Sequence, residues 1–115
     1  MEKAKVFLWN DDKVVLDSLA RFLAQQDYVG LLTTDISGIK SLRVDIAVLG
    51  FSNNQDGVYA AAYLKRELPD IEIISCATDD NVPYGDRYHL FSPEFEKLGE
   101  IIPSIMKEKE KERAV

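Results

Sequence analysis

The residues that could do chemistry stand where predicted strands end. The polar segment Asn10–Asp12 follows Lys5–Trp9, a run of β-branched and aromatic residues that predicts a buried strand. A second apolar run, Val44–Leu49, ends in Gly50. In an open α/β sheet, ligands bind outside the carboxyl ends of the strands. Gly50 therefore holds the position where a functional side chain is expected, but glycine has no side chain that could do chemistry.

Other chemical signals are sparse. His89 is the single histidine and lacks partners for a metal site, so we interpret it as a half-buried residue near a strand end that could also make a pH-sensitive contact. Cys76 is the single cysteine, and its apolar surroundings in the sequence predict a small buried side chain. The loop Ser52–Gln55 resembles neither a phosphate-binding loop nor a dinucleotide-binding fingerprint. We expect no cofactor and no catalytic residue, and hence no enzyme.

Strand and helix signals alternate along the whole chain. This alternation predicts one α/β domain, a doubly wound, five-stranded parallel sheet with helices on both faces. The predicted strands are Lys5–Trp9, Tyr28–Thr33, Val44–Leu49, Glu72–Ala77 and Arg87–Phe91. The predicted helices are Lys13–Gln26, a short one over Ile36–Leu42, Val58–Leu68, and a last one that opens at Pro93.

The alternation of strands and helices is interrupted after the fourth predicted strand. Thr78–Gly85 has the composition of a loop, and the next strand follows almost at once. A parallel crossover through a helix needs about a dozen residues or more. We therefore expect the fourth helix to be missing or reduced to a single turn, unless the fifth strand lies elsewhere.

Helix ends and breaks are predicted from single residues. Asp12 can cap the helix that follows it, and Asp56 is predicted to cap the helix over Val58–Leu68. Asp56 and Gly57 are also read as the turn into that helix. Pro103 falls inside the apolar stripe of the last helix and should kink it or split it.

Charge separates the end of the chain from the rest. Lys107–Arg113 alternates in sign, which indicates a solvated helix end or a frayed tail; a linker to a coiled coil or a partner is the alternative. We expect a domain over residues 1–106 and a charged tail or helix end over residues 107–115.

The bulk composition excludes some classes of function. The chain has 115 residues, 46% of them hydrophobic, which suits one globular domain. Its net charge is −6 and its 14 basic residues are scattered, so nucleic-acid binding is not expected. No apolar run approaches the ~18 residues of a membrane span, and Met1–Lys5 opens no secretory signal. We expect a cytoplasmic protein without membrane contact.

The whole pattern resembles the receiver domain of two-component response regulators. The resemblance rests on five strand units in this length, acids after the first strand and Pro93 after the fifth, and it covers nearly the whole chain. It implies a flavodoxin-like sheet of order 2-1-3-4-5. In a typical receiver, an acidic pair binds Mg²⁺, an Asp that ends the third strand accepts a phosphoryl group, and a Thr or Ser and a Lys assist.

The resemblance places these positions on residues of other types. The acidic pair falls on Asn10 and Asp11, the phosphoacceptor on Gly50, the Thr or Ser on Ala77, and the Lys on Ser92. Only Asp11 keeps the family identity, and a carboxylate nucleophile is absent.

The acidic pair could instead fall on Asp11 and Asp12, although Asp12 would then also serve the helix cap. We expect no specific metal site, with a residual role for these two carboxylates at most, because Mg²⁺ gives up its waters reluctantly.

The expected function is that of a degenerate receiver, or pseudo-receiver. It would be a signal-transduction module for protein–protein interaction, not regulated by aspartyl phosphorylation, with an unidentified signalling protein as partner. The alternative is a small-ligand or flavin-type binder, in which Trp9 and Tyr84 near the carboxyl edge would sandwich a flat ring.

The resemblance also implies a contact surface near the fifth strand. A missing helix would uncover aromatic residues there, and exposed apolar surface tends to mark a binding site. Partners or a homodimer would use the face of the fourth strand, fifth strand and last helix; the alternative is that the aromatics fill the gap as core. The candidate residues are Tyr84, Tyr88, His89, Phe91 and Phe95.

Overall fold

The computed structural model describes most of the chain as alternating strands and helices. The described residues are 4–26, 29–32, 44–51, 54–77, 88–91 and 96–113. The predicted α/β class is confirmed within them. The elements are β1 (Ala4–Asn10), α1 (Lys13–Ala24), β2 (Val29–Leu32), β3 (Ile46–Gly50), α2 (Asn54–Glu67), β4 (Glu72–Ala77), β5 (Tyr88–Phe91) and α3 (Leu98–Arg113).

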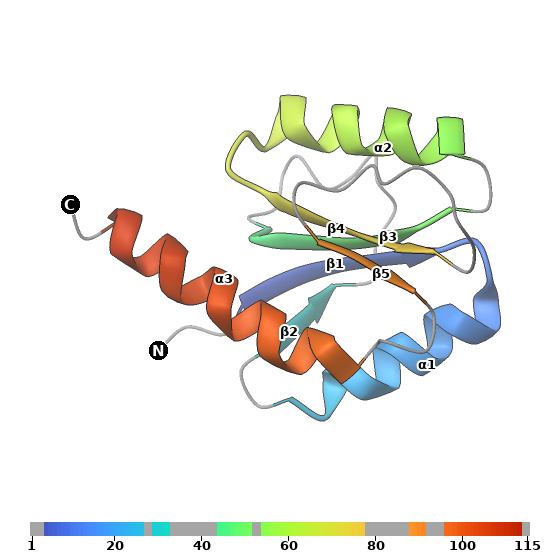
Figure 1. Ribbon diagram of the computed structural model, residues 1–115, viewed down its shortest axis with the longest axis horizontal. Helices are drawn as coiled ribbons and strands as arrows, with labels where there is room; N and C mark the ends of the chain where they lie inside the picture. Colours follow the sequence, from blue (N-terminus) through green and yellow to red (C-terminus); the bar gives the residue numbers. More distant parts are fainter. Residues whose placement is uncertain are drawn as a thin grey trace.

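The strands form one parallel sheet in the order β2-β1-β3-β4-β5. Helix α2 covers one face of this sheet, and α1 and α3 cover the other (Figure 1). The register pairs Val6 with Ile46 and Asn10 with Gly50, so β1 and β3 end side by side. The carboxyl ends of the parallel strands therefore meet at one edge of the sheet, and the amino ends meet at the opposite edge.

Alternate strand residues build two separate cores, because successive side chains of a strand point to opposite faces. Val6 and Leu8 join the core under α1 and α3, whereas Phe7 joins the core under α2. Leu19, Leu23, Leu98, Ile102 and Ile105 close the first core; Ala60, Ala61 and Leu64 close the second.

Cys76 is buried in the core beneath α1 and α3, as predicted. Burial raises the pKa of its thiol to about 12. The neutral thiol is therefore the form present near pH 7, and it packs as a small apolar group.

Helix α2 begins one turn earlier than its apolar pattern predicts. It starts at Asn54, so Asp56 and Gly57 lie inside it, and the predicted turn and Asp56 cap are wrong. Polar side chains and an acid in the first turn suit a helix start, where N–H groups lack partners and the dipole is positive. The apolar periodicity marks only the part of the helix that packs on the sheet, which is why Val58 looked like its beginning.

Helix α3 continues through Pro103 without a break, so the predicted split is wrong. Ile102 before the proline and Ile105 after it are buried in the same core. Packing on both sides of Pro103 holds the backbone helical and offsets the one hydrogen bond that proline cannot donate. The charged segment Lys107–Arg113 is part of this helix.

Some predictions fall outside the described residues. These are the short helix over Ile36–Leu42, the loop Thr78–Gly85 with its reduced fourth helix, and the start of the last helix at Pro93. Among the helices that are described, none combines the length and apolar composition that a bilayer crossing requires.

Candidate functional site at the carboxyl edge

The ends of β1 and β3 are joined directly at the carboxyl edge. Asn10 and Gly50 are register partners, and the backbone N–H of Asp11 donates to the Gly50 carbonyl over 3.0 Å. The carbonyl of Cys76 in β4 lies 3.1 Å from the position that a Cβ on Gly50 would take. Three neighbouring strands thus converge on Gly50, as the sequence predicts for the working edge of such a sheet.

The side chain of Asn10 occupies the space above Gly50. A Cβ built on Gly50 would lie 2.2 Å from Asn10 Nδ2 and 2.9 Å from Asn10 Cγ. Both distances are shorter than a non-bonded carbon contact of about 3.5 Å allows. A side chain at position 50 would therefore begin where the Asn10 amide now sits.

Asn10 is held in this position by the following turn. Its Oδ1 accepts a hydrogen bond from the backbone N–H of Asp12 at 2.8 Å. This contact fixes the orientation of the amide, because a carboxamide has one acceptor oxygen and one donor nitrogen, and the donor end is left over Gly50.

The two aspartates of this segment have local partners. Asp12 is the N-cap of α1, as predicted, and its Oδ1 accepts from the backbone N–H groups of Val14 and Val15 at 3.0 and 3.4 Å. Asp11 Oδ1 accepts from Trp9 Nε1 at 3.3 Å, on an exposed part of the surface. Within the described ranges, no group of three or more His, Cys, Asp or Glu side chains could hold a metal ion.

The other predicted pocket residues are only partly described. Ala77 ends β4 and is the register partner of Phe91 in β5. Its backbone therefore lies at the same edge as Asn10, Asp11 and Gly50. Ser92 lies outside the described residues.

The predicted aromatic face is described mainly through Tyr88. This residue begins β5, is half-buried, and packs against the core beneath α1 and α3. Tyr88 therefore contributes to the core, and its part in a contact surface stays a prediction. His89 and Phe91 lie in β5, whereas Tyr84 and Phe95 lie outside the described residues.

Trp9, on which the small-ligand alternative relied, lies next to the end of β1 with 39% of its surface exposed. The ring nitrogen is engaged by Asp11, as described above. Its proposed companion Tyr84 lies outside the described residues, so the ring sandwich stays a prediction.

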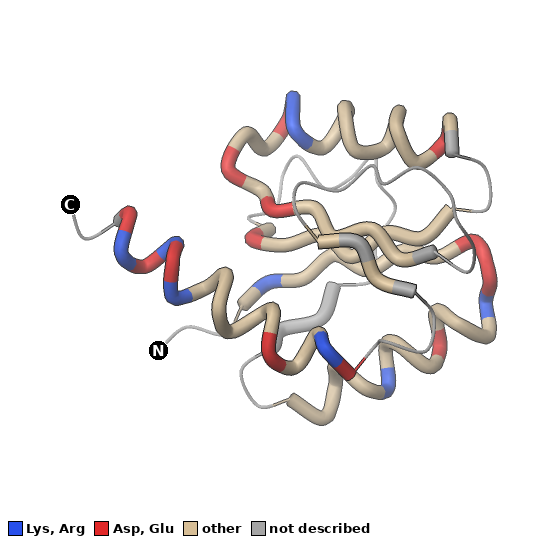
Figure 2. Tube along the Cα trace, in the orientation of Figure 1, with Lys and Arg blue, Asp and Glu red and all other residues tan. Residues whose placement is uncertain are grey.

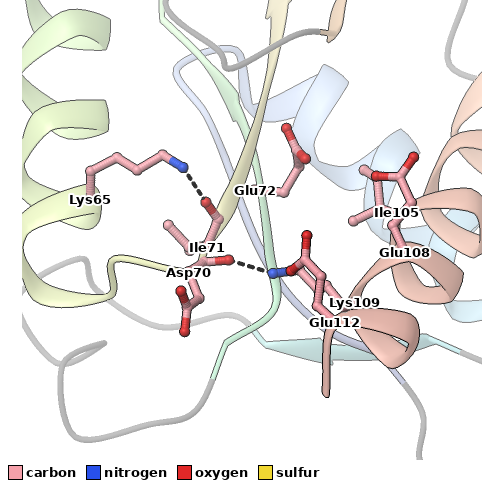
Figure 3. Close-up of a pocket in the computed structure, with 8 residues that line it drawn as sticks. All are labelled: Lys65, Asp70, Ile71, Glu72, Ile105, Glu108, Lys109 and Glu112. Atoms are coloured by element: carbon pink, nitrogen blue, oxygen red, sulfur yellow. Dashed lines mark hydrogen bonds between the residues drawn. The ribbon is translucent and has the colours of Figure 1, made fainter. Parts of the chain in front are cut away.

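A charged pocket at the amino edge was not predicted. It has a volume of about 440 Å³ and lies between the start of β4, the end of α2 and α3 (Figure 3). Lys65 Nζ donates to the carbonyl of Ile71, and Lys109 Nζ donates to the carbonyl of Asp70. Sequence reasoning had no signal for this pocket, because its residues come from segments about 40 positions apart. The remaining lining residues are Glu72, Ile105, Glu108 and Glu112.

Asp45 lies at the same amino edge, directly before the first residue of β3. It is 7% exposed, and its Oδ2 accepts from the backbone N–H of Lys5 at 3.0 Å. Its backbone N–H donates to the Lys5 carbonyl, and its carbonyl accepts from Glu72. Through its carboxylate and its backbone, Asp45 therefore joins the beginnings of three strands, and it stands far from Gly50.

Comparisons by sequence find neither a matching family model nor a matching curated protein. Comparison of structures does find proteins of similar fold. A response regulator from Thermotoga maritima superposes with a TM-score of 0.75 at 11% identity, covering 91% of this chain and 98% of that one.

Two structures of RcsB are also similar. The Salmonella typhimurium RcsB response regulator gives a TM-score of 0.72 at 16% identity over 93% of this chain and 62% of RcsB. The isolated REC domain of RcsB from Salmonella enterica serovar Typhimurium, in its apo form, gives 0.58 at 22% identity over 69% of this chain and 63% of that one. At such identities the likeness concerns the fold, and the fold of this chain is that of a response-regulator receiver domain.

Proposed function

We propose that this chain is a degenerate receiver, a signalling module that acts through protein contacts and is not regulated by aspartyl phosphorylation. The observation that carries the proposal is the Asn10 amide over Gly50, 2.2 Å from the position of a Cβ. The place where a phosphoacceptor side chain would begin is filled by a neutral group that the next turn holds in position.

Phosphoryl transfer to a receiver needs a carboxylate nucleophile at the end of the third strand. Here β3 ends in Leu49 and Gly50, and Phe51 follows. Asp45 stands five residues before Gly50, which corresponds to about 16 Å along a strand. Its carboxylate is bonded to the backbone of β1, so sliding the register does not supply a nucleophile.

The remaining acids of the edge are poor substitutes. Asp12 is turned toward the first N–H groups of α1, and Asp56 lies in the first turn of α2. Asp11 is exposed beside Trp9. A single carboxylate at this position gives weak attraction for Mg²⁺, which binds proteins through few but well-placed carboxylates and substrate phosphates. The proposed output is therefore a contact with an unidentified signalling protein, independent of phosphate.

Amide NMR tests this proposal directly. Spectra of the protein alone, with Mg²⁺, and with Mg²⁺ plus beryllium fluoride (a mimic of aspartyl phosphate) should superimpose at Asn10, Asp11, Gly50 and Ala77. A receiver with an intact phosphoacceptor serves as the positive control. Shifts of these four amides at millimolar beryllium fluoride would show that another acid accepts the group, and the proposal would fall.

A further inference from the structure

The outer face of α2 is unusually apolar. Val58 and Tyr59 are 49% and 64% exposed, and Ala62 is exposed as well. The opposite side of the helix, with Ala60 and Leu64, is buried on the sheet. Figure 2 shows the middle of α2 without charge, whereas the outer end of α3 alternates between acids and bases.

The exposed residues form one continuous stripe. Gln55, Tyr59, Ala62 and Arg66 follow one another at steps of three or four residues, the spacing that places side chains on one side of a helix. Val58 belongs to the same side, because it lies three residues after Gln55 and four before Ala62. Gln55 Nε2 donates to Tyr59 Oη at 3.0 Å. The stripe is therefore an ordered apolar surface framed by polar ends.

The two ends of helix α2, which flank the stripe, carry opposite charges. Asp56 lies in the first turn of α2, and Lys65 and Arg66 lie in the last. Asp56 and Arg66 are ten residues apart, about 15 Å along the helix axis. The Arg66 guanidinium lies 5.4 Å from the centre of the Tyr63 ring and is within 3.4 Å of Glu67, but its side chain is 72% exposed.

This arrangement is complementary to itself. When two such helices pack antiparallel about a two-fold axis near residue 61, Asp56 of each copy faces Arg66 of the other. The same operation places Tyr59 of each copy against Ala62 of the other, so a large side chain meets a small one. Because of the two-fold symmetry, each apolar contact and each charge pair then occurs twice in the dimer.

We propose that two copies of this chain associate through antiparallel packing of their α2 helices. One helix face per copy is smaller than the ~800 Å² per partner of a stable interface, so the dimer is weak and depends on concentration. This inference does not rest on the loss of phosphorylation, because α2 packs on the sheet face away from α1 and α3 whatever the state of Gly50 (Figure 1).

Sedimentation velocity of the full chain over a concentration series tests the dimer. The wild type should dimerise with a Kd below about 1 mM, and Tyr59→Arg should weaken the dimer at least tenfold. Val14→Arg is the matched control, since Val14 is 75% exposed on α1, and it should leave the dimer unchanged. If Tyr59→Arg unfolds the protein by circular dichroism, Ala62→Lys replaces it.

Charge reversal decides the orientation of the helices. Asp56→Arg and Arg66→Asp should each weaken the dimer several-fold, because like charges then face one another twice. The double variant should recover most of the wild-type affinity. A wild type that stays monomeric at 1 mM, a dimer insensitive to both stripe variants, or a double variant no better than the single ones would overturn the proposal.

Discussion

The two edges of the sheet use their polar and charged residues in different ways. At the carboxyl edge, Asn10 and Asp12 bond to backbone N–H groups two or three residues away. At the amino edge, Lys65 and Lys109 come from different helices and bond to consecutive carbonyls, those of Ile71 and Asp70 (Figure 3). Local turns thus occupy the polar groups where a receiver would do its chemistry. At the opposite edge, the contact of Lys109 with Asp70 spans 39 residues of sequence and brings α3 to the side of a charged pocket.

This difference shows that the type of a residue does not define a site. The sequence has three polar residues after the first strand, yet two of them are engaged in shaping the start of α1. The amino edge has no motif, yet it gathers four carboxylates around one pocket. A polar side chain that hydrogen-bonds to the backbone has less capacity left to bind a ligand, so the backbone contacts decide which polar groups could act.

The largest expected effect of substitution is at Gly50. Gly50→Ala should lower the free energy of unfolding by about 1–3 kcal/mol, because the new Cβ meets the Asn10 side chain and the Cys76 carbonyl. No described glycine has a positive φ, so the cost is steric and not conformational. Urea unfolding followed by circular dichroism measures it.

A double-mutant cycle then tests the role of Asn10. Asn10→Ala combined with Gly50→Ala should cost about 1 kcal/mol less than the sum of the single changes, because the clash is removed. Additive effects would mean that Asn10 does not fill the space above Gly50, and the contrast between the edges would lose its main support.

A slightly smaller effect is expected at the amino edge from Asp45→Ala. The Lys5 N–H would lose its buried charged acceptor, which should cost about 2 kcal/mol in the free energy of unfolding. Asp70→Ala, an exposed change at the same edge, is the control and should stay within about 0.5 kcal/mol. Equal losses in urea unfolding for both variants would contradict the assigned role of Asp45.

The smallest expected effect is a difference in stability between substitutions of two neighbouring acids, Asp11 and Asp12. Asp12→Ala removes the N-cap of α1 and should cost about 1 kcal/mol, whereas Asp11→Ala should cost less than about 0.5 kcal/mol. Thermal unfolding at pH 7 compares them. A greater loss from Asp11→Ala would indicate that Asp11, and not Asp12, is the acid committed to structure.

Local signals determined much of this protein from sequence. Apolar runs bounded by polar turns predicted the strands, and helical periodicity predicted the helices, because each pattern reflects burial within a single element. The cap at Asp12 and the burial of Cys76 followed for the same reason. The start of α2 at Asn54 was not predicted, since the first turn of this helix carries no apolar periodicity.

Only the tertiary structure decided the features that join distant segments. Asn10 and Gly50 lie 40 residues apart, and their contact depends on the register between β1 and β3. Helix α3 continues through Pro103 because residues on both sides of the proline pack in the core. The amino-edge pocket forms because α3 lies beside the start of β4. Sequence patterns report the burial of one element at a time, whereas these features arise from how the elements pack together.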